Sequence, residues 1–450
     1  MGGEPTLNGP GDGRRLHVTV SMGDAAHLLR RAGFGVTPGL LGELMALPSR
    51  AAAVDRMLDT SRAPSAAIEP VPPYQLLDTG TALGLMTQWW IDRMRTSPVP
   101  LVEKLTLFWH GHFVSGADKV QDFSLLMRQN QLFRAQALGS YYDLAQAVAV
   151  DPAMLLYLDN WANVKDRPQE NFARELMELF TIGARNVTEP DVIAMARAWT
   201  GHGLDGFQRT YEFHPAQHDD GRFSLFGSAP RQWNGPDALR AVLLGPKSIE
   251  ASRFISAKLF SFLAYPVTPD DPLVHVLADR FRANRLQLRP LVRDILLSDA
   301  FWSDGARGAL VRSPIEWAVA AMQGADVAAG AVSPSLYLLP MGQAPFHPPN
   351  VSGWKQNAYW LSTSANWGKA AFALQVRNRV AESRQPTPDT RPARTVVSEG
   401  FSRYGIVAPS PTTRAALEGW VSRAQAEGDA AHIAPNLAML LLLSPDFQIA

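Results

Sequence analysis

The stretch that decides the fold prediction is residues 101–113, which read LVEKLTLFWHGHF. Within it Leu101, Leu105, Phe108 and His112 recur at the i, i+4, i+7, i+11 spacing of one helical face. Because that face is almost wholly apolar, the pattern predicts a buried helix over 100–112. The same periodicity extends through most of the chain, so we predict a mostly α fold: a large multi-helix domain with one small β-hairpin insertion.

Capping residues and apolar periodicity predict the other helices. Ser21, followed by Asp24, caps a first helix that Gly33 ends, and Thr188 caps a later one. The further predicted ranges are 38–59, 74–97, 122–137, 140–149, 169–182, 189–200, 235–244, 247–264, 270–281, 287–298, 310–325, 334–340, 364–382, 411–426 and 434–444.

The segment 209–227 changes to a period of two. Tyr211 and Phe213 alternate with polar residues, and so do Phe223 and Leu225, on the far side of an Asp-Gly pair at 220–221. This pattern predicts a β-hairpin between the two apolar pairs.

Composition changes divide the chain into four parts. Residues 1–20 are rich in glycine and polar residues and predict a disordered tail. Residues 21–382 form the main helical domain, which includes the hairpin. Residues 383–410 carry few apolar side chains and predict an exposed loop or linker. Residues 411–450 then supply C-terminal helices that pack on the main domain.

Composition also excludes several classes of protein. The 42 basic and 42 acidic residues cancel, which argues against nucleic acid as a partner. The absence of cysteine removes disulfides, thiolate nucleophiles and zinc–sulfur sites. No apolar run approaches the ~18 residues of a membrane span. The N-terminus has no apolar run of the signal-peptide kind, so we expect a soluble, cytoplasmic protein.

Ordered motifs over residues 21–450 resemble the bacterial family known as "domain of unknown function 1800". The matching stretches are HLLRRAGFG (27–35), EKLTLFWHGHF (103–113), NFARELMELFTIG (171–183), TEPDV (188–192), AWTG (198–201), HDDG (218–221), the segment 342–354 and LSPDFQ (443–448). The resemblance implies a mostly helical protein, and it brings no established reaction with it. Many relatives look exported. This chain has QEN at 169–171 where relatives usually have NEN, and His202 where they often have tryptophan.

Two histidines end the 100–112 helix. On an unbroken helix His110 and His112 point about 200° apart and cannot share a ligand. A break at Gly111 would let both imidazoles turn inward and hold a metal. Alternatively, His112 completes the buried face and His110 caps carbonyl groups at the helix end.

The acidic helix at 169–182 places Asn171, Glu175 and Glu178 on one face. Two carboxylates three residues apart can bind one metal or share acid–base work, so Glu175 and Glu178 are the candidate catalytic residues. The structural alternative is a solvated face on which Arg174 pairs with Glu170 and Glu178.

Other candidates flank these helices. His218 and Asp219, beside the hairpin, are the remaining candidate metal ligands, whereas Asp220 is explained by the turn. Arg30 and Arg31 would grip a carboxylate or phosphate, or else pair with the acidic helix. In the proline-rich stretch 345–354, His347 and Trp354 would line a substrate pocket, unless that stretch is a rigid plug on the core.

These residues lead to a functional hypothesis with two alternatives. The hypothesis is a metal-dependent enzyme, in its plainest form a hydrolase of a small or carbohydrate-like substrate, in which a divalent metal of unknown identity activates water. The first alternative is a non-catalytic helical scaffold that binds a protein partner and contains a buried polar network. The second is an oxidoreductase that uses iron or copper.

Overall fold

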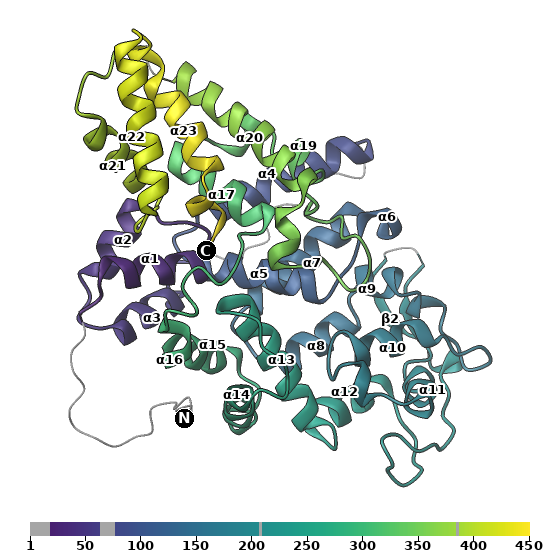
Figure 1. Cartoon of the computed structure of the whole chain (residues 1–450). Helices are drawn as coiled ribbons and strands as arrows, with labels where there is room; N and C mark the ends of the chain where they lie inside the picture. Colours follow the sequence, from purple (N-terminus) through teal and green to yellow (C-terminus); the bar gives the residue numbers. More distant parts are fainter. Residues whose placement is uncertain (1–18, 64–76, 207–208, 384–386) are drawn as a thin grey trace, which may run out of the picture.

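The computed structural model describes residues 19–63, 77–206, 209–383 and 387–450, which are built almost entirely from helices (Figure 1). The predicted mostly α fold with a small β insertion is therefore confirmed. Residues 1–18 of the predicted tail and residues 74–76 of the predicted 74–97 helix lie outside the described residues. Within the described part of the chain, no helix is long and apolar enough to cross a membrane.

The helices of the first part of the chain begin mostly at Ser, Thr or Asp caps or at proline. Ser21 and Thr188 accept the backbone N–H groups of Asp24 and Asp191, as predicted. These helices are α1 (Met22–Arg31), α2 (Pro38–Met45), α3 (Arg50–Leu58), α4 (Thr79–Thr96), α5 (Pro100–His112), α6 (Ala117–Val120), α7 (Phe123–Ala135), α8 (Tyr141–Ala149), α9 (Pro152–Tyr157), α10 (Glu170–Glu178) and α11 (Glu189–Ala198), with 3-10 turns η2 (Asn160–Ala162) and η3 (Ala184–Asn186).

The two strands and the remaining helices follow. The strands are β1 (His202–Leu204) and β2 (Tyr211–Phe213), followed by the 3-10 turn η4 (Pro215–Gln217). The helices are α12 (Gly235–Leu244), α13 (Ser248–Leu263), α14 (Pro272–Ala283), α15 (Leu288–Leu297), α16 (Asp299–Trp302), α17 (Pro314–Ala325), α18 (Ala329–Val332), α19 (Ser335–Leu338), α20 (Thr363–Glu382), α21 (Ala393–Arg403), α22 (Pro411–Ala426), α23 (Ile433–Leu443) and α24 (Pro445–Gln448), with 3-10 turns η5 (Asn357–Leu361) and η6 (Ala430–His432).

Two predicted elements differ from the structure. The predicted 38–59 helix is two helices, because Pro48 restricts the residue before it and cannot donate a helical hydrogen bond. The predicted loop at 383–410 contains α21, which buries Val396, Val397 and Phe401 against its neighbours. Few apolar residues were therefore enough to dock this helix, and the exposed-loop prediction was wrong for 393–403.

The predicted hairpin partner was also wrong. Strand β2 pairs with β1, with His202 opposite Phe213, and not with the segment around 223–225. The Asp-Gly turn at 220–221 is held locally, because Asp219 Oδ1 accepts the Gly221 N–H at 2.9 Å. Phe223 instead forms an isolated bridge with Arg231.

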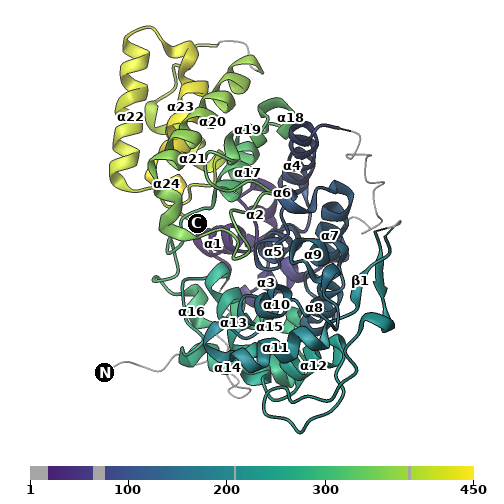
Figure 2. The same ribbon diagram turned by 90° about the vertical axis from the view of Figure 1, so that its right-hand side faces the viewer.

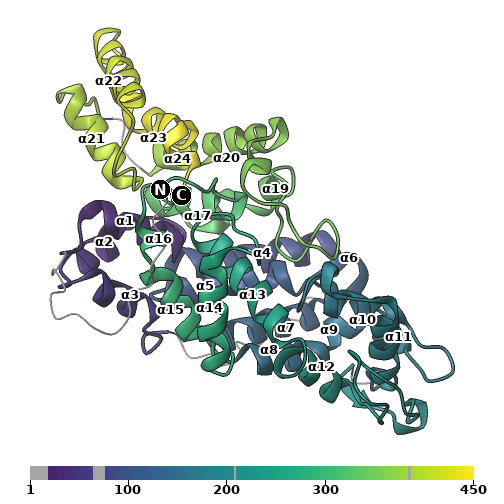
Figure 3. The ribbon, with the colours of Figure 1, turned by 60° about the horizontal axis from the view of Figure 1, so that its bottom comes forward.

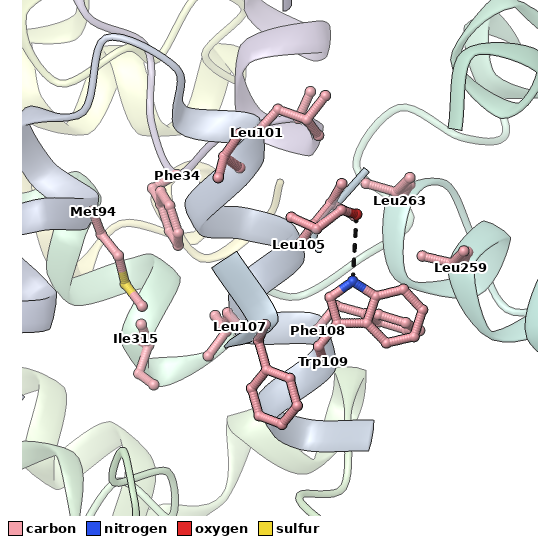
Figure 4. Close-up of a cluster of buried hydrophobic side chains, with 14 of the residues drawn as sticks. Phe34, Met94, Leu101, Leu105, Leu107, Phe108, Trp109, Leu259, Leu263 and Ile315 are labelled. Carbon is pink, nitrogen blue, oxygen red and sulfur yellow. Dashed lines mark hydrogen bonds between the residues drawn. The ribbon is translucent and has the colours of Figure 1, made fainter. Parts of the chain in front are cut away.

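Helix α5 lies in the middle of the molecule, with α3, α4 and α7 packed against it (Figures 1 and 2). Leu101 and Leu105 are completely buried, as the sequence pattern predicts, and Trp109 is completely buried as well. Figure 4 shows these side chains among leucines from α13 and Ile315 from α17. The helix therefore connects the two sides of the core, and residues at its C-terminal end are held rigidly.

A buried ionic network fixes α5 to its neighbours. Glu103 Oε1 accepts Arg93 Nε and Arg134 Nε, each at 2.7 Å. Glu103 Oε2 accepts Trp90 Nε1 at 3.0 Å and Arg134 Nη2 at 2.9 Å. Burial acts to raise the pKa of Glu103, but the two arginines outweigh it and the net shift is downward. Glu103 is therefore ionised and fully satisfied, as a structural anchor must be.

The molecule is elongated in the view of Figure 3, with α21 and α22 at one end and α11 at the other. The helix α20 packs against both α17 and α23 and so joins the C-terminal helices to the centre. The segment between α19 and α20 covers the C-terminal end of α5, because Phe346 and Trp354 contact His110 there. The candidate site lies under this covering segment.

Candidate functional site

The two histidines of α5 lie on opposite sides of an unbroken helix. Helix α5 continues through Gly111 to His112, so the break that a shared ligand would require does not occur. His110 Nε2 accepts the Phe346 N–H at 3.0 Å. His112 Nε2 donates to the Phe180 carbonyl at 2.9 Å. Burial lowers the pKa of His110 to about 3, and burial with the nearby charge of Lys258 lowers that of His112 well below its usual value.

The acidic helix α10 presents a half-exposed charged face. Arg174 pairs with Glu170 at 3.1 Å and with Glu178 at 3.4 Å, as the structural alternative expected, and also with Glu189 at 2.8 Å. Burial and the adjacent Glu178 raise the pKa of Glu175. Among the described residues, the side chains of Glu175 and Glu178 do not join those of His110 and His112 in one cluster.

The residues beside the hairpin have protein partners of their own. His218 Nδ1 donates to the Thr200 carbonyl at 2.8 Å. Asp219 Oδ2 accepts Arg197 Nε at 2.6 Å, and this arginine lowers the pKa of Asp219. Across residues 19–63, 77–206, 209–383 and 387–450, no three His, Cys, Asp or Glu side chains gather as a metal site would require. In that part of the chain, no cluster of ligands therefore supports the metal hypothesis.

Two of the four predicted substrate contacts, Arg31 and Trp354, line one cavity. The other two do not. His347 is exposed, and Arg30 lies beside Arg307, where burial and then the like charge lower the pKa of Arg30 to about 10. Arg31 donates through Nη2 to the Ala306 carbonyl at 2.6 Å and does not pair with the acidic helix α10.

The cavity measures about 490 Å³ and lies between α5, α13, the start of α17 and the segment 343–360. This volume is within the range of small-molecule sites in proteins. Gly353, at φ 76°, allows the covering segment to approach α5, because a Cβ atom there would overlap the Gly111 carbonyl oxygen. The aromatic walls of the cavity come from Phe108, Phe254, Phe262, Trp354 and Trp360.

A buried ion pair closes one side of the cavity. Lys104, on the inner face of α5, donates to Glu316 Oε1, and both side chains line the cavity. The other oxygen of Glu316 accepts the Ser313 N–H at 2.8 Å in a capping box of α17. Burial acts to raise the pKa of Glu316, but Lys104 outweighs it, and the carboxylate stays ionised.

Positive charge exceeds negative charge around the cavity. The described lining contains three cationic side chains, from Arg31, Lys104 and Lys258, and one carboxylate side chain, from Glu316. Even without Lys258, whose pKa is lowered, two cationic side chains of the lining face one carboxylate side chain. Arg312 is buried near Arg30 and Arg31. Burial and then the charges of these two arginines lower the pKa of Arg312.

Several guanidinium nitrogens of this cluster lack a protein partner. Arg31 and Arg312 are both buried, and in each the Nε and Nη1 atoms make no hydrogen bond with any described residue. A buried charged group without hydrogen-bond partners is costly, so unpartnered guanidinium nitrogens of this kind are rare in folded proteins. Arg31 lines the cavity, where the charge of Glu316 acts on it.

Lys258 supplies the second distinctive group. Its Nζ donates to His112 Nδ1 at 3.1 Å and to the Leu179 carbonyl at 3.2 Å, and it lies 4.8 Å from the Phe254 ring centre. No described carboxylate pairs with it. Burial lowers the pKa of Lys258 to about 8.

The sequence patterns missed Lys104, Lys258, Arg312 and Glu316. A usable pattern existed for the two lysines, because each interrupts the apolar repeat of a long helix where the inner face should be uncharged. No pattern along the chain could show that Glu316 balances Lys104, since 212 residues separate them.

Comparison with known proteins gives one match. The model of a family described as "Protein of unknown function (DUF1800)" matches residues 27–449. No curated protein and no solved structure matches the chain.

Proposed function

Since the chain belongs to the DUF1800 family, whose description names no activity, we propose from the cavity itself that the protein binds a small organic anion, as the substrate site of an enzyme. The observation that carries this proposal is the surplus of buried positive charge, with unpartnered nitrogens on Arg31. A carboxylate or phosphate can accept two parallel N–H bonds from a guanidinium group. The negative charge of the ligand would balance the positive charge of the lining that Glu316 does not compensate.

The aromatic walls of the cavity indicate the chemical nature of the rest of the ligand. Five aromatic side chains surround the charged groups, and such walls favour an organic molecule over a bare inorganic ion. Lys258 and His112, already hydrogen-bonded at 3.1 Å, offer a lysine that can exchange a proton near neutral pH. This proposal uses no metal, because the predicted ligands lie apart in the described residues.

Inorganic phosphate is the first probe of the anion site. We expect phosphate to raise the melting temperature of the wild type above that in chloride at equal ionic strength. Arg31→Met should weaken phosphate binding by roughly 10- to 100-fold, because a hydrogen bond to a charged group contributes about 1.5–3 kcal/mol. Calorimetric titration measures the affinity directly.

The matched control is Arg185→Met, which removes an exposed arginine paired only with Asp270 among the described residues. It should leave phosphate binding unchanged. Lys258→Met serves as a second cavity variant if Arg31→Met folds poorly, and it should also weaken binding. Equal phosphate affinities in the wild type and both cavity variants would contradict the proposal.

A further inference from the structure

We propose that Lys258 is the reactive amine of the cavity and forms an imine with the aldehyde or ketone carbon of the bound anion. The inference rests on the proposed function, because the anion site is what would bring such a carbonyl compound to Lys258. It adds a substrate class, small anionic oxo compounds, and a chemical step.

The surroundings of Lys258 differ from those of the other six lysines in the chain. Lys104, Lys119 and Lys247 have carboxylate partners. Lys369 is bonded to the Trp360 carbonyl at 3.1 Å and to Gln448 Oε1 at 2.8 Å. The remaining two, at 165 and 355, are exposed. Lys258 alone combines a place in the cavity lining with uncharged partners.

The hydrogen bonds of Lys258 suit a neutral amine. Because His112 Nε2 must donate to the Phe180 carbonyl, its Nδ1 carries no proton and accepts an N–H from Lys258. A second N–H is directed to the Leu179 carbonyl. A neutral amine has two N–H groups and one lone pair, so both N–H groups are occupied and the lone pair remains for a group in the cavity. Burial lowers the pKa of Lys258 to about 8, so a larger fraction of this amine is neutral near pH 7.5 than of an ordinary lysine.

The step balances without any external oxidant or reductant. The lone pair of Nζ adds to the carbonyl carbon, the C=O π electrons move to oxygen, and one amine proton passes to that oxygen. The second amine proton and the hydroxyl group then leave together as water, while the C=N bond forms. The apolar rings of Phe254 and Phe262 on the cavity wall limit the water available to reverse it.

Reductive labelling tests the inference with two aldehydes. Glyoxylate carries a carboxylate and an aldehyde, formaldehyde carries only the aldehyde, and cyanoborohydride converts each imine into a stable secondary amine. Peptide mass spectrometry then gives the labelling rate of every lysine. With glyoxylate, we expect Lys258 to react at least ~10-fold faster than the exposed lysines at 165 and 355 at pH 7.5, because more of it is neutral. The rate should rise through a midpoint near pH 8.

Variants separate this inference from the anion site. Lys258→Arg should lose the cavity label yet keep phosphate binding, and Lys369→Arg should change neither. If Lys258 reacts no faster than the exposed lysines with either aldehyde, the imine proposal is overturned, whatever phosphate does. A second outcome would be fast labelling of Lys258 by formaldehyde, no faster labelling by glyoxylate, and an unchanged labelling rate in Arg31→Met. That outcome would contradict the anion site, and the imine proposal, which rests on that site, would fail with it.

Discussion

Glu103→Gln should lower the free energy of unfolding by about 3–5 kcal/mol, the range found when one partner of a buried ion pair is removed. All four hydrogen bonds at the Glu103 carboxylate come from donors on Arg93, Arg134 and Trp90. A glutamine amide turns two more donors toward these groups in either orientation, and it also leaves Arg134 buried without a counter-charge. Urea unfolding at neutral pH measures the loss.

Two further variants control this result. Glu382→Gln removes an exposed carboxylate paired with Arg379 and should change stability by less than about 0.5 kcal/mol. Glu103→Met combined with Arg134→Met removes both main charges and should recover part of the loss. A Glu103→Gln protein as stable as the wild type would show that the network does not anchor α5.

Acidification from pH 8 to pH 5 should destabilise the protein by several kcal/mol through its buried histidines. Burial lowers the pKa of His27 and of His110 to about 3, that of His202 to about 4, and that of His112 well below its usual value. The unfolded chain binds protons at its ordinary histidine pKa of about 6.5, so this stability is present above pH 6.5 and is lost as the pH falls toward 3. His27, His110 and His202 each contribute about 2 kcal/mol at pH 5, or about 6 kcal/mol for these three, and His112 contributes with the same sign.

His110→Gln isolates one of these four histidines. The glutamine oxygen can still accept the Phe346 N–H that His110 Nε2 accepts, but it does not titrate. The difference in unfolding free energy between pH 8 and pH 5 should therefore shrink by about 2 kcal/mol. His347→Gln, at an exposed position, should leave that difference unchanged. An unchanged pH dependence in His110→Gln would mean that His110 is protonated in the folded protein.

The sequence was sufficient to predict local structure wherever one chain segment determines it. The apolar face of α5 and the caps at Ser21 and Thr188 are set by neighbouring residues, and all three are confirmed. The partner of strand β2 was predicted wrongly, because pairing with β1 depends on where α11 ends. Short-range patterns do not contain that information.

The candidate site was predictable only in part, and for the same reason. Sequence clustering directed attention to histidines and acids, and the contacts of His110, His112 and Asp219 turned out to be separate hydrogen bonds and ion pairs. Arg31 and Trp354, two of the predicted substrate contacts, line a cavity. Lys258 reaches His112 across 146 residues of sequence, and only folding brings such groups together.

The most direct test of the anion site is a crystal structure of the wild-type protein soaked in selenate, read from the anomalous scattering of selenium. The cavity between α5, α13 and α17 should contain a strong selenium peak within hydrogen-bonding distance of Arg31, and the same peak should be absent from Arg31→Met crystals. Selenium peaks confined to the protein surface, with none in the cavity of well-diffracting wild-type crystals, would contradict the account.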